Sequence, residues 1–310
     1  MRIVFIGSSE LAIPSLEKII NSSNHFLVGI ISQPDRPAGR KRKLTPTALK
    51  SHALSKDLEV FTPESISSEE CYNYVKKLNF DIFVVVGYGQ FIPNKIIKLA
   101  EYKAINLHPS LLPKYRGASP VQYSLLNGDD LTGVSIIYVI DKMDAGDIIL
   151  QKEIKIDHED DFLSLHDKLA SAGSSILIDA LNKIESNSSK IIIQDNDIAS
   201  YTKKIIKEDG IINWQNSAED IYNKIRAFNF WPGCYSFLPN GEKITILKAS
   251  INSLEGIPGT ILDERFTVAT GFKSISILEL QQAGKRKMDI NSFLNGNKVS
   301  KNQKMLTKIT

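Results

Sequence analysis

Apolar and polar positions follow two rhythms along the first two hundred residues. Short apolar runs that predict buried strands occur at Ile3–Ile6, Phe26–Ile31, Asp81–Val86 and Ala104–Leu107. Between them, apolar residues recur at helical spacing, as at Ile13, Leu16 and Ile19. Strands that alternate with helices favour a parallel sheet with right-handed crossovers. The sequence therefore predicts a Rossmann-like, mostly parallel α/β sheet in its first part.

Val134–Ile140 and Ile148–Ile156 predict two further strands, and Leu163–Ile184 predicts one long helix. The pattern of apolar positions changes after this helix, near residue 190. Beyond it, short strands with few helices favour a small β-barrel of the OB type. The expected strands are Cys234–Leu238, Lys243–Ala249, Gly259–Leu262, Phe266–Thr270 and Ile275–Leu280. We expect a catalytic domain at 1–188, a linker at 189–206, a β-barrel domain at 207–310, and a frayed polar tail from Asn295.

Composition narrows the class of protein. The chain has 310 residues, of which 42% are hydrophobic and 24% charged, as in ordinary globular proteins. No apolar run approaches the roughly 20 residues of a membrane span, and the first residues lack a signal-peptide cleavage site. We therefore expect a cytoplasmic protein. Cys71 and Cys234 match no metal or redox spacing, and we expect no metal.

Charge is distributed unevenly. The net charge is +3, but residues 201–310 hold 16 Lys and Arg against 10 Asp and Glu, whereas residues 1–200 hold 22 against 25. A basic last third suggests a polyanionic partner.

The stretch from Ala104 to Pro120 carries the first candidate chemistry. Asn106 and His108 are two residues apart at the end of a predicted strand, so both side chains leave on the same face. Sites of α/β proteins lie where such strands end. An amide donor beside an imidazole, which can take or give a proton near neutral pH, is suited to acyl transfer.

Asp144 is the candidate third group. It lies in a Met-Asp-Ala-Gly-Asp turn, from which a carboxylate can orient His108 and support its charged form. The alternative is that it merely stabilises the turn, as aspartates often do. Asp147 is the rival carboxylate, and we expect it to cap the turn. Spacing alone does not show that Asp144 meets His108.

These residues resemble the folate-dependent formyltransferases. The resemblance rests on Asn-Leu-His-Pro-Ser-Leu-Leu-Pro from Asn106 to Pro113 and on Asp-Ala-Gly-Asp from Asp144 to Asp147. It implies 10-formyltetrahydrofolate as formyl donor and a catalytic set of Asn106, His108 and Asp144. Two turns would bind the donor through backbone groups and apolar walls. The residues concerned are Ser110, Leu111, Leu112, Pro113, Gly87, Tyr88, Gly89 and Phe91.

Further segments resemble the members of this family that formylate methionyl-initiator tRNA. They are Gln33–Arg40, Arg226–Gly233 and Leu280–Lys285. In the first region, basic residues gather on a loop stiffened by prolines, where they can neutralise phosphates. The candidate tRNA-binding residues are Arg36, Arg40, Lys41, Arg42 and Lys43. A charge run that only faces solvent is the alternative.

Other functions fit less well. A dinucleotide-binding oxidoreductase needs three glycines after the first strand, and Gly7–Ala12 offers one. Family members that act on glycinamide ribonucleotide or sugar nucleotides, or that hydrolyse the folate, stay open, although the basic loop and second domain favour tRNA. A non-catalytic tRNA-binding protein is disfavoured by the intact Asn106, His108 and Asp144. We expect a monomer.

Overall fold

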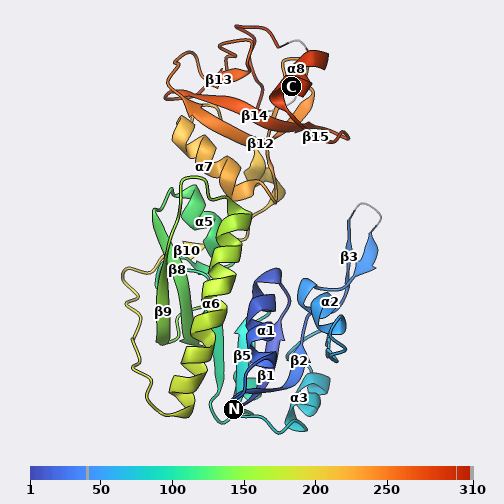
Figure 1. Ribbon diagram of the computed structural model, residues 1–310, viewed down its shortest axis with the longest axis vertical. Coiled ribbons are helices and arrows are strands. Elements are labelled where there is room, and N and C mark those ends of the chain that lie inside the picture. Colours follow the sequence, from blue (N-terminus) through green and yellow to red (C-terminus); the bar gives the residue numbers. More distant parts are fainter. Residues whose placement is uncertain (40–41, 298, 308–310) are drawn as a thin grey trace. The chain divides into compact units, whose positions relative to one another are not determined.

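The computed structural model describes residues 1–39, 42–297 and 299–307, so Arg40 and Lys41 lie outside the described residues. The chain divides into two compact units (Figure 1). The first contains Met1–Pro120, Leu131–Lys155 and His166–Thr202. The second contains Val121–Asp130, Ile156–Leu165 and Lys203–Thr310.

A six-stranded sheet of order β2-β1-β5-β6-β8-β9 forms the centre of the first unit. Its strands β2, β1, β5 and β6 are parallel, while β8 and β9 are antiparallel to their neighbours. The bounds are β1 (Arg2–Gly7), β2 (Phe26–Ile31), β5 (Ile82–Val86), β6 (Ala104–His108), β8 (Leu131–Tyr138) and β9 (Ile148–Lys155). The prediction of a mostly parallel, Rossmann-like sheet is confirmed.

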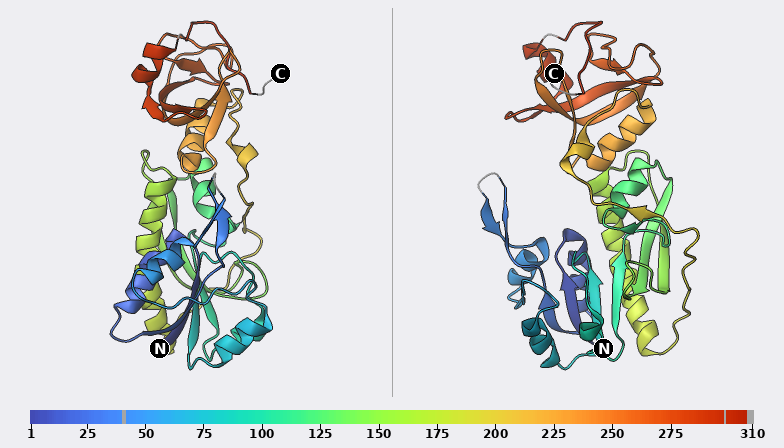
Figure 2. Two further views of the ribbon diagram at one scale, coloured as in Figure 1. Left: turned by 90° about the vertical axis from the view of Figure 1, so that its right-hand side faces the viewer. Right: turned by 180° about the vertical axis from the view of Figure 1, so that it is seen from behind.

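Helices lie on both faces of this sheet, as the edge-on view in Figure 2 shows. On one face lie α1 (Ile13–Ile20), which buries Leu16 and Ile19, and α6 (Phe162–Glu185). On the other, β1 and β5 pack through Val4, Ile6, Phe83 and Val85 against α3 (Glu69–Lys76) and α4 (Asn94–Ile97). The remaining helices of the first unit are η1 (Glu10–Ala12) and α2 (Ala48–Leu54), while α5 (Pro120–Leu126) falls, except for Pro120, in the second unit.

The carboxyl ends of β1, β2, β5 and β6 meet at one edge of the sheet, because these strands are parallel. Beyond β2 the chain forms a hairpin of β3 (Arg36–Ala38) and β4 (Lys43–Thr45), where the sequence indicated only a loop. Two short strands pair in parallel. They are β7 (Arg116–Gly117), in the segment that follows β6, and β10 (Tyr201–Thr202). This edge therefore collects the loops that carry the candidate site.

The second unit holds a curled antiparallel sheet of order β11-β12-β14-β13, with β15 paired to β14. Isolated bridges connect the edge strands β13 and β11, so the sheet closes on itself. They join Ile261 to Val268, Thr260 to Lys304, and Phe237 to Leu306. The predicted β-barrel is confirmed. The elements are η2 (Lys207–Gly210), α7 (Ala218–Phe228), β11 (Cys234–Phe237), β12 (Lys243–Asn252), β13 (Thr267–Ala269), β14 (Ser274–Gln282), β15 (Lys287–Asp289) and α8 (Ile290–Gly296).

The expectation of a frayed tail from Asn295 is wrong for its described residues, 295–297 and 299–307. Met305 is 3% exposed, and its amide donates to the Gly259 carbonyl at 2.8 Å. Leu306 exchanges two backbone hydrogen bonds with Phe237. Met305 and Leu306 are held in place because their backbone groups supply the pairing that closes the barrel.

In the part of the chain that the structure describes, no helix combines the length and the apolar character that crossing a membrane requires.

Candidate active site

Strand β6 presents Asn106 and His108 on the face of the sheet opposite to Leu107. Leu107 packs against α6, where a Cβ at Gly173 would come within 2.7 Å of its side chain. On the site face, Asn106 lies opposite Ile137 and His108 opposite Ser135 in the register with β8. The half-buried Asn106 amide forms no hydrogen bond with any described residue, so its donors and acceptor are available to a ligand.

His108 lies between a backbone carbonyl and a carboxylate. Its Nε2 is 2.9 Å from the Tyr115 carbonyl oxygen. A carbonyl only accepts, so Nε2 carries a hydrogen, and Nδ1 is left as the nitrogen that gains or loses a proton. Nδ1 is 3.6 Å from Asp144 Oδ2, and both side chains are largely buried, at 5% and 16% exposed. The structure thus brings together the two groups that spacing alone could not connect.

Asp144 occupies a turn between β8 and β9 in a left-handed conformation, with φ of 49°. Its Oδ2 accepts a hydrogen bond from the Gly117 amide at 2.8 Å. The rival Asp147 contributes its carbonyl to the backbone bond from Tyr138, and its carboxylate forms no ion pair with His108. The carboxylate that faces the imidazole therefore belongs to Asp144.

The Ser110–Pro113 loop is pinned to the neighbouring strands through Ser135. The Ser135 hydroxyl donates to the Ser110 carbonyl at 2.6 Å and accepts from the Leu112 amide at 3.1 Å. Gln151 donates to the Leu112 carbonyl at 2.9 Å and to the Ser135 hydroxyl at 2.8 Å. The buried Leu112 side chain packs with Ile137 and Ile148, whereas Leu111 and Pro113 are half-buried. The loop is held rigidly beside His108, and both backbone polar groups of Leu112 are engaged.

The Gly87–Phe91 segment follows β5, next to β6 at the same edge. Gly87 has φ of 55°, and a Cβ there would come within 2.1 Å of Ser9 Oγ, so glycine is required. Gly89 also has positive φ, and Phe91 is 60% exposed. Tyr88 points into the core at 3% exposure, and its hydroxyl has no hydrogen-bond partner among the described residues. Burial raises the pKa of Tyr88 to about 12.

The described basic residues of the hairpin are exposed. Arg36 pairs with Glu64 at 2.8 Å, with both side chains exposed. Arg42 and Lys43 form no ion pair with the described residues, and Arg42 has a left-handed φ of 47°. Two of the five predicted tRNA contacts, Arg40 and Lys41, lie outside the described residues.

Several residues that hold the site were not found from the sequence. They include Tyr115 and Gly117, through the backbone bonds described above, and Ser135, which pins the loop after His108. The buried Arg116 also belongs here, and its place in the Tyr-Arg-Gly run after the Leu-Leu-Pro turn was the available signal. Gln194, which donates to the Asp144 and Gly146 carbonyls, stands in a polar stretch that offers no signal.

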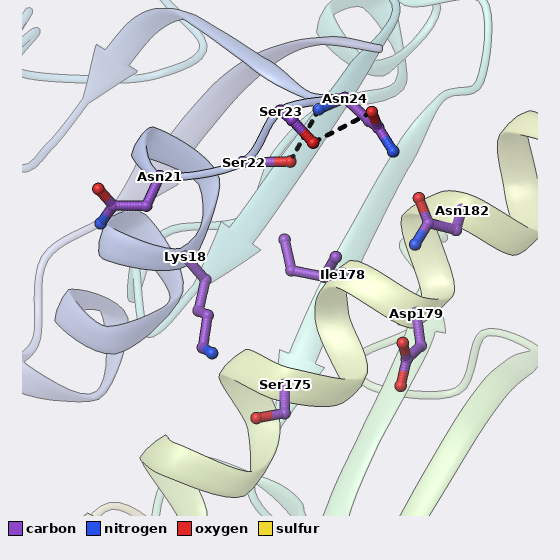
Figure 3. A pocket seen from close by; sticks show the side chains of 9 residues that line it. All are labelled: Lys18, Asn21, Ser22, Ser23, Asn24, Ser175, Ile178, Asp179 and Asn182. Carbon is purple, nitrogen blue, oxygen red and sulfur yellow. Dashed lines mark hydrogen bonds between the residues drawn. The ribbon is translucent and has the colours of Figure 1, made fainter.

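The first unit also has a surface cavity of about 450 Å³ on the opposite edge of the sheet (Figure 3). Its walls come from the end of α1, the turn before β2 and one side of α6. The lining residues are Lys18, Asn21, Ser22, Ser23, Asn24, Ser175, Ile178, Asp179 and Asn182. None of the predicted site residues lines it.

Comparison with known proteins gives two family matches. Residues 1–181 match the formyl transferase family, and residues 204–298 match the formyl transferase C-terminal domain. Methionyl-tRNA formyltransferases are similar over almost the whole chain. The enzyme of Sulfurihydrogenibium sp. (strain YO3AOP1) is 41% identical, covering 96% of this chain and 98% of its own. That of Halothermothrix orenii is 39% identical, covering 98% of this chain and 100% of its own.

A solved structure of WlaRD, a sugar 3N-formyl transferase studied in the presence of dTDP and 5-N-formyl-THF, has a similar fold. It is 25% identical, with a TM-score of 0.66, and the match covers 92% of this chain and 99% of that one. Two formyl transferase family models match the chain, and relatives at 41% and 39% identity cover nearly all of it. The chain belongs to the formyl transferase family.

Proposed function

We propose that this protein transfers the formyl group of 10-formyltetrahydrofolate to the α-amino group of methionyl-initiator tRNA. The product is N-formylmethionyl-tRNA, which serves translation initiation. The observation that carries the proposal is the 3.6 Å approach of His108 Nδ1 to Asp144 Oδ2, with Asn106 on the same face of β6. The methionyl-tRNA formyltransferases that are 41% and 39% identical support the choice of acceptor.

The chemistry follows from the charges that develop. The α-amino nitrogen attacks the formyl carbon and forms a tetrahedral intermediate with a negative oxygen. The Asn106 amide and the Nδ1–H of a protonated His108 donate hydrogen bonds to that oxygen, since the Nε2–H is engaged by the Tyr115 carbonyl, and each donor contributes a stabilisation of about 3 kcal/mol. Asp144 supports the positive charge on the imidazole. The attacking nitrogen, which carries a positive charge after addition, gives up one proton. The bond between the carbon and folate N10 then breaks, and N10 takes up that proton through the relay of His108.

The donor would bind at the carboxyl edge between the Gly87–Phe91 and Ser110–Pro113 segments. Exposed Phe91 and half-buried Leu111 provide apolar surface for the folate. Tyr88 contributes through its backbone, because its side chain lies in the core. The solved relative that was studied with 5-N-formyl-THF supports a folate donor for this fold.

The acceptor would bind through the basic hairpin and the basic last third of the chain, residues 201–310. Arg42 and Lys43 are free of ion pairs with the described residues and can each approach a phosphate. Arg36, Arg40 and Lys41 complete the proposed set. Because these contacts are to the backbone, they position the tRNA without reading its sequence.

We also propose a domain organisation, an oligomeric state and a cellular location for this protein. We assign catalysis to a domain at 1–188 and tRNA binding to one at 207–310, joined by a linker at 189–206, in a monomer. The family matches at 1–181 and 204–298 support this division. A cytoplasmic location fits an acceptor that must next enter translation initiation.

A direct assay separates the proposal from its alternatives. The protein is incubated with 10-formyltetrahydrofolate and, in parallel, with methionyl-initiator tRNA, glycinamide ribonucleotide, an amino-sugar nucleotide, or no acceptor. We expect formyl transfer to the charged tRNA alone. Transfer only to a small amine would assign the chain to another branch of the family. Folate hydrolysis without transfer would contradict the proposal.

A further inference from the structure

Residues 194–202 lie in the first unit, in the segment between α6 and η2, and contact residues of the candidate site. Their contacts converge on two residues with left-handed backbones, Asp144 with φ of 49° and Tyr115 with φ of 63°. Residues other than glycine adopt this conformation only where their surroundings impose it. One of the two carries the carboxylate that faces His108, and the other carries the carbonyl that His108 bonds.

Gln194 holds the Asp144 turn. Its Nε2 donates to the Asp144 carbonyl at 2.8 Å and to the Gly146 carbonyl at 2.7 Å. Its Oε1 accepts from Arg116 Nε at 3.0 Å and from Arg116 Nη2 at 2.8 Å. A glutamine amide has two donors and two acceptor positions, and all four are used here. The orientation of the amide is therefore fixed, because turning it over would set its NH₂ against the guanidinium.

Arg116 supplies the rigid base for this arrangement. Its side chain is 0% exposed, and it forms no ion pair with a carboxylate of the described residues. Its remaining acceptors are Asn196 Oδ1 at 2.9 Å and the Tyr201 hydroxyl at 3.2 Å. Hydrogen bonds from a charged donor are stronger than neutral ones, and a buried charge makes losing them costly. The guanidinium thus locks the segment that carries Gln194.

Ser200 holds the Tyr115 end of the site. Its hydroxyl accepts from the Tyr115 amide at 2.8 Å, and its carbonyl accepts from the Arg116 amide at 2.8 Å. Pairing continues into β7 and β10, where Gly117 lies opposite Thr202. The Gly117 amide in turn donates to Asp144 Oδ2. Both supports of His108 are therefore fastened to the same segment.

We propose that residues 194–202 position the site for formyl transfer. Gln194, oriented by the buried Arg116, is a positioning residue that fixes Asp144 against His108, and Ser200 is a positioning residue that fixes the Tyr115 carbonyl on His108. Gln194 touches neither substrate; it acts through the turn. The kinetic part of the inference rests on the proposed formyl transfer. The structural part, the placement of Asp144, does not.

Gln194→Glu tests the inference, because a carboxylate keeps the size of the side chain and pairs well with Arg116 but cannot donate to the Asp144 and Gly146 carbonyls. The matched control is Asn196→Asp, which also places a carboxylate on Arg116 but leaves the bonds to the turn intact. Each variant is measured in the full-length protein for thermal stability, for kcat, and for KM toward both substrates. Its crystal structure gives the position of Asp144.

For Gln194→Glu we expect a melting temperature no lower than wild type, a kcat reduced about 10- to 100-fold and KM values within about twofold. The turn should leave its wild-type position. Asn196→Asp should keep kcat within about twofold. A folded Gln194→Glu enzyme with wild-type kcat and an unmoved Asp144 would overturn the inference.

A second variant keeps the test decisive if Gln194→Glu does not fold. Ser200→Ala removes the acceptor of the Tyr115 amide and should lower kcat about tenfold, with KM unchanged; wild-type kcat in that variant would overturn the inference instead. An inactive wild type would refute the proposed function alone, and the crystal structures would then decide whether Gln194 or Ser200 places the residues around His108.

Discussion

Asp144 Oδ2 lies 3.6 Å from His108 Nδ1 and 2.8 Å from the amide of Gly117. One carboxylate oxygen thus faces both the imidazole and the loop that follows it. Because His108 Nε2 is tied to the Tyr115 carbonyl, a second proton enters at Nδ1, beside this carboxylate. We therefore predict that Asp144 supports the charged form of His108 during transfer.

Asp144→Asn should lower kcat about 100-fold at neutral pH. The amide keeps an oxygen for the Gly117 bond, and asparagine tolerates the left-handed backbone, so the fold is preserved. What is lost is the negative charge that favours the imidazolium. Steady-state kinetics with both substrates measure the effect. Asp147→Asn, in the same turn, is the control and should stay within a few-fold of wild type. The reverse order of the two variants would transfer the role to Asp147.

Replacing Arg42 and Lys43 together with glutamine should raise the KM for methionyl-initiator tRNA. Two phosphate contacts are removed, so the slope of log affinity against log salt should fall by about 2. The KM for the folate donor should not change. The control replaces Lys77 and Lys98, which are exposed in the segments that precede β5 and β6, at the other edge of the sheet. An unchanged salt slope in the hairpin variant would remove the hairpin from the acceptor site.

Tyr88→Phe separates a backbone role at the donor site from a side-chain role. The buried hydroxyl has no partner among the described residues, so its removal should leave the KM for the folate unchanged and stabilise the fold by up to about 1 kcal/mol. A clear rise in that KM would mean that the phenol contacts the donor.

The same variant has a predicted alkaline phenotype. Burial holds the pKa of Tyr88 at about 12, above its ordinary value near 10, so the folded state keeps its proton over a range where the unfolded state loses it. The ionisation of this tyrosine therefore leaves the stability unchanged below pH 10 and lowers it as the pH rises from 10 to 12. Denaturant unfolding at pH 9 and pH 11 should therefore show a smaller loss of stability for Tyr88→Phe than for wild type. Equal losses would contradict the assignment.

The sequence predicted the strands of this protein whose residues are almost all buried. Strands β1, β5 and β6 were found because the core side of the sheet requires continuous apolar residues there. The β3–β4 hairpin was not predicted because the residues of both strands are exposed, so hydrophobic periodicity marks neither face. The pairing of Met305 and Leu306 escaped because it depends on backbone hydrogen bonds to residues far away in the chain.

The residues of the candidate site were likewise predicted only where a local sequence pattern places them. Asn106 and His108 were found because two residues of one strand share a face. The approach of Asp144 to His108 depends on the pairing of β6 with β8 and on the turn after β8, which no local pattern encodes. The supporting residues Arg116 and Gln194 are 78 positions apart, and only the fold brings them into contact.

The single-turnover rate of formyl transfer, compared between wild type and His108→Ala with both substrates saturating, tests the central claim most directly. Labelled formyl from 10-formyltetrahydrofolate is followed onto methionyl-initiator tRNA, and the dissociation constants of both substrates are measured on the same samples. We predict transfer by the wild type, and a rate about 10³-fold lower in His108→Ala with both dissociation constants within about twofold of wild type. Transfer at the wild-type rate by a folded His108→Ala protein would contradict the account.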